Sequence, residues 1–105
     1  MLGRNRFAEL VRRQLDLFEE DASALLAEAE DADAAWTRAD REDSEELYGD
    51  YQLVVDEVAE RLLDVRESYA ATLEAETAEE YRASFNRAAS KRFRRYATLL
   101  EDETT

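Results

Sequence analysis

The sequence predicts an all-α protein, an elongated antiparallel three-helix bundle that runs up, down and up. Proline is absent from the 105 residues, and glycine occurs only at Gly3 and Gly49, so the residues that usually interrupt helices are nearly missing. Apolar residues recur at helical spacing in three stretches, with two short polar stretches between them. The length and the 45% hydrophobic content suit a single domain over residues 1–105 with a modest core.

The first helix is expected over residues 5–38. One arc of this helix carries apolar side chains at helical spacing: Phe7, Val11, Phe18, Ala22, Leu25, Ala29 and Trp36. Four leucines widen the arc and predict contact with two neighbouring helices: Leu10, Leu15, Leu17 and Leu26. Gln14 and Asp21 interrupt the arc, and we expect them to meet a polar residue of another helix.

The second helix is expected over residues 44–74, after a polar connection. Two interleaved series of residues spaced by seven, as in coiled coils, run along it: Tyr48, Val55, Leu62 and Tyr69, then Tyr51, Val58, Val65 and Thr72. Asp43 and Glu46 have the spacing of a capping box at its start. Gly49 has three possible consequences there: it loosens the first turns, lets Trp36 approach closely, or moves the helix start beyond itself.

The third helix is expected over residues 78–100, with Thr77 as its N-cap and Glu80 completing a capping box. Its apolar positions again recur at helical spacing: Tyr81, Phe85, Ala89, Phe93, Tyr96, Leu99 and Leu100. The acidic tail, residues 101–105, is expected to fray. The short third helix leaves apolar surface on the other two, and we expect self-association to cover it.

The charge is strongly acidic, with 27 acidic and 14 basic residues and a formal net charge of −13. Lys91 is the only lysine. Two explanations fit this composition equally well: a GC-rich coding sequence, or adaptation of the surface to high salt.

Several kinds of chemistry are excluded by composition. The chain has no histidine and no cysteine, which removes imidazole bases, thiol nucleophiles and the usual zinc ligands. Asp31, Asp33 and Glu42 occupy three positions of a calcium-loop template, but Trp36 stands where the template requires glycine. Most other carboxylates lie on outward arcs, so we expect no enzyme activity, no catalytic residue, no metal ligand and no cofactor.

The strongest functional candidate is a basic run on the third helix. Four cations share one outward arc: Arg87, Lys91, Arg94 and Arg95. They suit a docking site for an acidic partner or a phosphate backbone. Alternatively, they offset the helix dipole and pair with the acidic first two helices. Arg92 points into the apolar arc, and we expect it either to snorkel, extending its guanidinium to solvent, or to reach a carboxylate such as Asp21 or Glu28.

Three apolar residues are further candidates for an interface. Leu53 faces the acidic arc of the second helix, and Leu63 lies outside the main apolar stripe. Trp36 ends the first helix, where it either packs in the core or anchors an interface. Leu53 and Leu63, together with the wide apolar arc of the first helix, leave room for a fourth helix or a second copy of the chain.

The function predicted from these features is a non-enzymatic interaction module, such as an adaptor, scaffold or assembly chaperone. Its expected partners are further copies of itself or a helical protein. A nucleic-acid-related regulator, acting through the basic run or through an acidic mimic of nucleic acid, is the alternative, and a carboxylate metal site is a lesser one. No apolar run approaches the roughly 18 residues of a membrane span, and no signal peptide is recognisable, so we expect a cytoplasmic protein.

Overall fold

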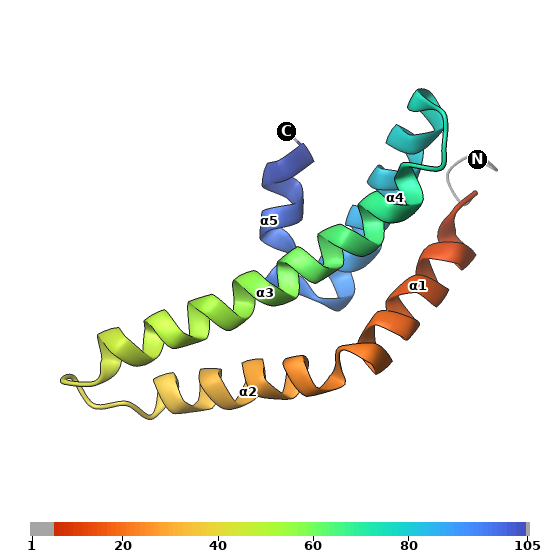
Figure 1. Ribbon diagram of the computed structural model, residues 1–105. Helices are drawn as coiled ribbons and strands as arrows, with labels where there is room; N and C mark the ends of the chain where they lie inside the picture. The colour runs from red at the N-terminus through yellow and green to blue at the C-terminus, as the bar shows by residue number, and fades with distance from the viewer. Residues whose placement is uncertain (1–5, 105) are drawn as a thin grey trace.

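The protein folds into five helices and, over the part of the chain that the structure describes, no strand (Figure 1). The computed structural model describes the backbone of residues 6–104 and the side chains of residues 6–98 and 100. The helices are α1 (Ala8–Asp21), α2 (Ser23–Thr37), α3 (Ser44–Ala70), α4 (Ala75–Arg92) and α5 (Arg94–Thr104). The all-α prediction is confirmed, whereas the three-helix, up-down-up arrangement is not.

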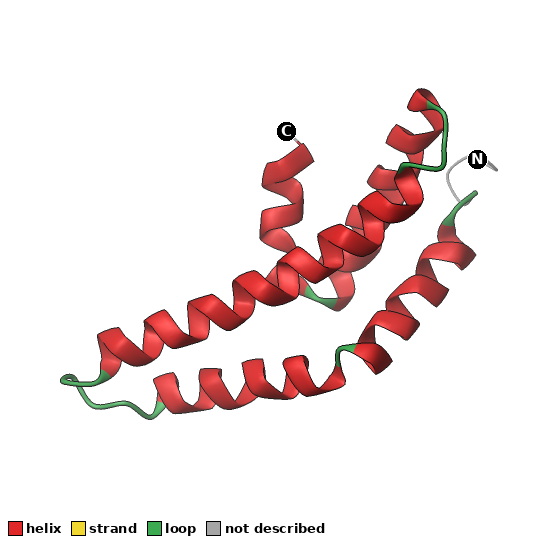
Figure 2. Cartoon of the chain, in the orientation of Figure 1, coloured by secondary structure: helices red, strands yellow, loops and turns green. Residues whose placement is uncertain are grey.

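The predicted first helix is two helices that meet at Ala22 (Figure 2). Ala22 leaves the helical conformation, with φ −99° and ψ 18°. Its N–H nevertheless donates to the carbonyl of Phe18 at 2.8 Å, and its own carbonyl accepts from the N–H of Leu26 at 2.9 Å. The chain therefore bends with these hydrogen bonds intact, so that α2 follows α3 while α1 packs mainly on α4. The predicted start at residue 5 lies outside the described residues.

Residues 38–43 connect α2 to α3, and α3 then runs to Ala70 without a break. The capping box predicted from Asp43 and Glu46 is wrong, because the Asp43 side chain accepts no cap hydrogen bond. The Asp40 carboxylate instead accepts from the N–H of Asp43 at 3.1 Å. Gly49 lies inside α3, and a Cβ added there would meet no described atom within 4 Å. Gly49 therefore neither ends the helix nor admits a close neighbour.

Glu74, rather than the predicted Thr77, caps α4. One Glu74 carboxylate oxygen, Oε1, accepts from the backbone N–H groups of Glu76 at 3.1 Å and Thr77 at 3.3 Å. The Thr77 hydroxyl donates to the same oxygen at 3.3 Å. A carboxylate at this position also suits the positive end of the helix dipole. α4 thus begins at Ala75, earlier than predicted, and α3 ends earlier than the predicted residue 74.

The predicted third helix breaks at Phe93, and α5 turns back from there (Figure 1). Phe93 has φ −126° and ψ 50°, and its ring packs edge-on against Phe18 of α1 at 5.4 Å between centroids. The turn brings α5 onto α3 and buries three of its residues: Tyr96, Ala97 and Leu100. A continuous helix would carry these residues away from the core. α5 also continues to Thr104, through the segment predicted to fray, and Thr105 lies outside the described residues.

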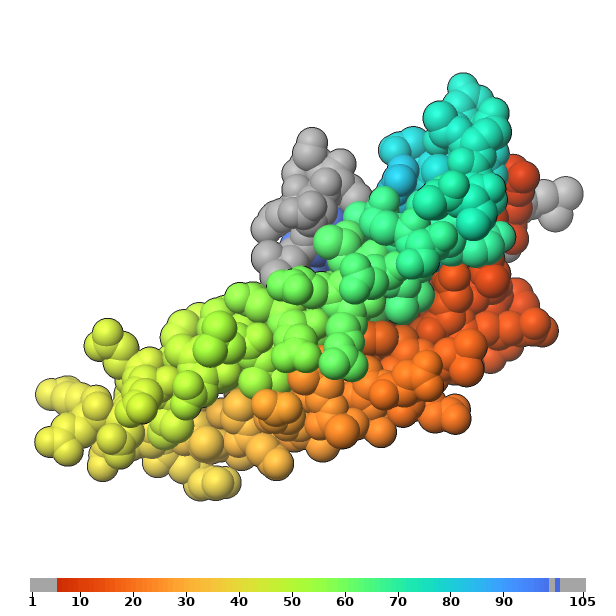
Figure 3. Space-filling model, viewed as in Figure 1, coloured from red at the N-terminus to blue at the C-terminus, as the bar shows by residue number. Residues whose placement is uncertain are grey.

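The molecule is elongated, with extents of 52 × 27 × 23 Å (Figure 3). At one end α2 and the first half of α3 pair antiparallel, and we call this part, residues 23–57, the arm. At the other end α1, α4, α5 and the rest of α3 share a core. Tyr81 is completely buried there, and its hydroxyl donates to the Gln14 side chain at 2.8 Å. The expectation that Gln14 meets a polar residue of another helix is confirmed.

Candidate interaction surfaces

The first candidate surface is a groove of about 550 Å³ along the arm. Residues from both helices line this arm groove: Glu28, Asp31, Ala32 and Ala35 of α2, and Leu47, Asp50, Leu53, Val54 and Glu57 of α3. Leu53 is 70% exposed, the most exposed large apolar residue among those described. Leu47 and Val54 beside it are half-buried. The groove thus presents apolar side chains to solvent where the two helices meet.

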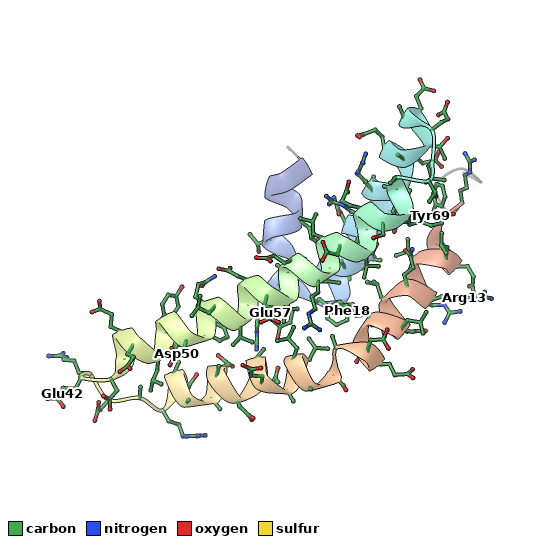
Figure 4. The ribbon with its side chains drawn as sticks, in the orientation of Figure 1. Arg13, Phe18, Glu42, Asp50, Glu57 and Tyr69 are labelled. Atoms are coloured by element: carbon green, nitrogen blue, oxygen red, sulfur yellow. The ribbon has the colours of Figure 1, made fainter. Side chains whose placement is uncertain are left out.

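Carboxylates surround this apolar strip. Within the described residues, no cation forms an ion pair with Glu28, Asp31 or Asp50. Glu57 is the exception, because Arg61 lies 3.2 Å from it. Figure 4 shows Asp50 and Glu57 on the length of α3 that runs beside α2. The arm groove therefore combines exposed apolar surface with uncompensated negative charge.

A second groove, of about 460 Å³, lies at the bend between α1 and α2. Its lining includes Leu17, which is 59% exposed, together with Asp21, Arg61 and Asp64. The α3 residues of both grooves fall in one stripe at helical spacing: Leu47, Asp50, Leu53, Val54, Glu57, Arg61, Asp64 and Val65. This bend groove continues the arm groove along the same side of α3. Leu17 was predicted to widen the apolar contact surface of its helix, but the structure leaves it exposed.

The third surface is basic and lies between α4 and α5, where the chain turns at Phe93. This elbow groove encloses about 780 Å³ and has a lining of small, polar and basic residues: Ala83, Asn86, Arg87, Ser90, Lys91, Arg94, Ala97 and Thr98. The structure therefore brings three of the four predicted cations to one groove, and all three are exposed.

Arg95, the fourth predicted cation, points away from this groove toward the arm. Its guanidinium lies 3.4 Å from the Glu30 carboxylate and 3.6 Å from that of Asp33, both on α2. Trp36 is half-buried nearby and stacks on Tyr51, with ring centroids 5.6 Å apart. Arg95 and Trp36 thus take part in contacts between helices.

Arg92 also reaches α1, but through carboxylates other than those predicted. Its Nη2 lies 2.7 Å from Asp16 and 2.5 Å from Glu19. The expectation that Arg92 reaches a carboxylate is confirmed, but the two suggested partners, Asp21 and Glu28, are wrong, because the carboxylates it meets are those of Asp16 and Glu19. The hydrogen bond to Glu19, and then that to Asp16, raise the pKa of Arg92. The pairing ties α4 to α1 beside the break at Phe93.

Two further residues differ in their surroundings from what the pattern indicates. Leu63 is half-buried and packs against the core, so it lies away from the arm groove that Leu53 lines. Arg66 was not singled out as a candidate, yet its side chain is only 4% exposed. Its Nη1 donates to Asn86 at 2.9 Å and its Nε to Glu67 at 2.8 Å. The burial of Arg66 could have been predicted from its position four residues after Leu62, which places it on the apolar arc of the helix.

No protein-family model, curated protein or solved structure matches this chain. Among the described residues, no group of three or more acidic side chains is placed to hold a metal ion. Asp31 and Asp33, from the calcium-loop template, both lie within helix α2. None of the helices, as far as the chain is described, has the length and apolar character needed to cross a membrane.

Proposed function

We propose that this protein is a non-enzymatic interaction module whose arm groove binds a cationic, amphipathic helix of a partner protein. The observation that carries the proposal is the exposure of Leu53, 70%, in a groove bordered by Glu28, Asp31 and Asp50. A helix-binding groove is one of the recurring ways in which proteins recognise a partner, and it suits an adaptor, a scaffold or an assembly chaperone.

Burial of the apolar side chains of the arm groove would contribute to the free energy of binding. Leu47 and Val54 are seven residues apart on α3, so they lie on one side of the helix, and Leu53 is next to Val54. These three side chains can contact the apolar face of a docked helix. Complete burial of one leucine side chain contributes about 1.5–3 kcal/mol. Each 1.4 kcal/mol corresponds to roughly a tenfold change in affinity, so Leu53 alone can alter binding substantially.

The charges of the groove favour a basic partner over a second copy through the same groove. Two copies that met groove to groove would bring the unpaired carboxylates of Glu28, Asp31 and Asp50 against their counterparts. Like charges placed next to each other across an interface weaken binding by several kcal/mol. A helix with lysine or arginine on either side of an apolar stripe would instead meet opposite charge. Self-association through another surface stays a prediction.

A labelled model peptide tests this proposal by fluorescence anisotropy. The peptide is an amphipathic helix with leucine on one face and lysine on the others. We expect the wild-type chain to bind it and Leu53→Asp to weaken binding by about tenfold or more. Ser23→Asp is the matched control, because it adds the same charge at an exposed position of α2 outside the groove.

Two results would count against the proposal. One is equal binding by wild type and Leu53→Asp when circular dichroism shows the same helix content. The other is equal binding of a peptide in which glutamate replaces every lysine, because the acidic border should reject it.

A further inference from the structure

The cations without a carboxylate partner are unevenly distributed. Most of the described arginines form an ion pair, as expected in a chain with 27 acidic and only 14 basic residues. Within the described residues, those without one fall in two places. Arg38 and Arg41 lie in the connection between α2 and α3, and the other three line the elbow groove: Arg87, Lys91 and Arg94. Three uncompensated cations thus converge on one groove of a strongly acidic protein.

The neighbouring arginines show that this convergence is selective. Arg82 pairs with Glu67 at 2.9 Å, Arg92 with Asp16 at 2.7 Å, and Arg95 with Glu30 at 3.4 Å. On α4 and α5 the cations that face the rest of the molecule are therefore neutralised, and those that face the groove are not. α5 also begins at the groove with no acidic residue in its own first turn, so no residue of that turn offsets the positive end of the helix dipole.

The shape of the groove suits an extended ligand. Its walls come from α4 and α5, and small side chains, Ala83 and Ala97 among them, leave room for a backbone to approach. Arg87 and Lys91 are four residues apart on α4, so they lie on one side of that helix, and Arg94 adds a third cation to the groove from the start of α5. Three cations that line one groove match a segment that carries several carboxylates.

We propose that the elbow groove, through Arg87, Lys91 and Arg94, binds a short acidic segment of another protein. Charge distinguishes this ligand from nucleic acid and from a second copy of the chain. At physiological salt, charges more than about 8 Å away are largely screened, so a short segment experiences mainly the three cations. A nucleic acid would extend beyond them onto the acidic remainder of a chain of net charge −13, and a second copy would bring −13 of its own.

A labelled peptide of glutamate, serine and glycine serves as the probe. Fluorescence anisotropy compares the wild-type chain with the triple variant Arg87→Gln, Lys91→Gln, Arg94→Gln. The matched control is Arg13→Gln, Arg38→Gln, Arg41→Gln, which removes the same charge at exposed sites outside the groove. We expect the groove variant to lose about tenfold in affinity and the control to lose no more than about twofold. Wild-type binding should weaken between about 50 mM and about 300 mM salt.

Three outcomes would overturn the proposal. They are no binding of the peptide by the wild-type chain at low salt, equal weakening by the groove and control variants, and tighter binding of a single-stranded DNA oligonucleotide than of the peptide. The substituted side chains are exposed, so circular dichroism should show unchanged helix content in both variants. The substitutions leave the arm groove untouched, and loss here is therefore distinguishable from failure of the helix-binding function.

Discussion

Arg66 is a charged residue that is almost completely buried, which is unusual for an arginine. It lies on the core-facing side of α3, between Leu62 and Tyr69, and is nearly inaccessible to solvent. Burying a guanidinium is costly unless hydrogen bonds replace its water. Asn86 and Glu67 supply those bonds, and Glu67 in turn accepts from Arg82 at 2.9 Å. The hydrogen bonds from Arg82, followed by those from Arg66, lower the pKa of Glu67 against the opposing effect of its burial.

Replacing Arg66 with methionine should destabilise the fold. The change keeps much of the side-chain volume but removes the buried guanidinium that donates to Asn86 and Glu67, so we expect a loss of about 1–3 kcal/mol. Urea unfolding followed by circular dichroism measures it. Arg61→Met on the same helix is the control, because its exposed pair with Glu57 contributes less than about 1 kcal/mol. Equal effects of the two substitutions would contradict a special role for Arg66.

Tyr81 should make stability fall at high pH. Burial raises the pKa of Tyr81 from 10.0 to about 12, although the hydrogen bond to Gln14 acts in the opposite direction. A pKa that is higher in the folded state than in the unfolded state gives stability that is complete below pH 10. That stability is lost as pH rises toward about 12, because the unfolded chain releases the proton first.

The Tyr81→Phe variant isolates this contribution. It should lose about 0.5–1.5 kcal/mol at neutral pH, since the hydrogen bond to Gln14 disappears. Its stability should also decline less steeply above pH 10 than that of the wild type, as urea unfolding at a series of pH values would measure. A parallel decline of both proteins would show that another group controls the high-pH loss.

At the scale of the elements, local signals located the helices better than their ends. All three predicted apolar stripes are helical, yet two of them are divided, at Ala22 and at Phe93. Neither break contains proline or glycine. Both instead follow from packing: α1 bends onto α4, and α5 turns back onto α3. Sequence patterns describe which side of a helix is apolar, but they do not say which element lies against it.

Gly49→Ala should stabilise α3. Glycine in a helix interior costs about 1 kcal/mol relative to alanine, because its backbone loses more freedom on folding. The added Cβ would meet no described atom within 4 Å, so no steric penalty opposes the gain. We expect the free energy of unfolding to rise by about 0.5–1 kcal/mol in urea titrations. A loss of stability would show that α3 does not continue through this position.

At the scale of the molecule, charge is sorted by surface. Most of the charged residues that line the arm and bend grooves are acidic, and all of those that line the elbow groove are basic. These surfaces have no residue in common, which allows two partners of opposite charge to bind one chain. Ion pairs between helices contribute to this separation of charge, because they neutralise Arg92 and Arg95, whereas the cations of the elbow groove have no carboxylate partner among the described side chains.

Salt should raise the melting temperature. With a net charge of −13, carboxylates repel one another across the surface, and raising the ionic strength from 0.1 M to 1 M shortens the screening length from about 10 Å to about 3 Å. We expect circular dichroism melts in increasing KCl to shift upward. The double variant Asp31→Asn, Asp50→Asn should melt higher than the wild type at low salt, and its response to KCl should be smaller. A melting temperature that does not change with KCl would favour the GC-rich coding explanation of the composition.

The cations of the elbow groove could be predicted only in part from the sequence. The basic run identified Arg87, Lys91 and Arg94, but helical spacing also grouped them with Arg95, which pairs with α2. Leu53 was recognised because an apolar residue on an acidic arc is a local anomaly. Leu17 was missed because its place beside an apolar arc looked ordinary, yet the structure leaves it 59% exposed in a groove that Ala22 also lines.

The sequence by itself determined the helical class, the apolar stripes, the excess of acid and the absence of histidine and cysteine chemistry. These properties depend on composition and on neighbours within a few turns of one helix. Only the tertiary structure decided where the stripes bend, which arginines find carboxylates and which apolar residues stay exposed. Those outcomes depend on distances between helices far apart along the chain, and they place an acidic groove on the arm and a basic one at the elbow.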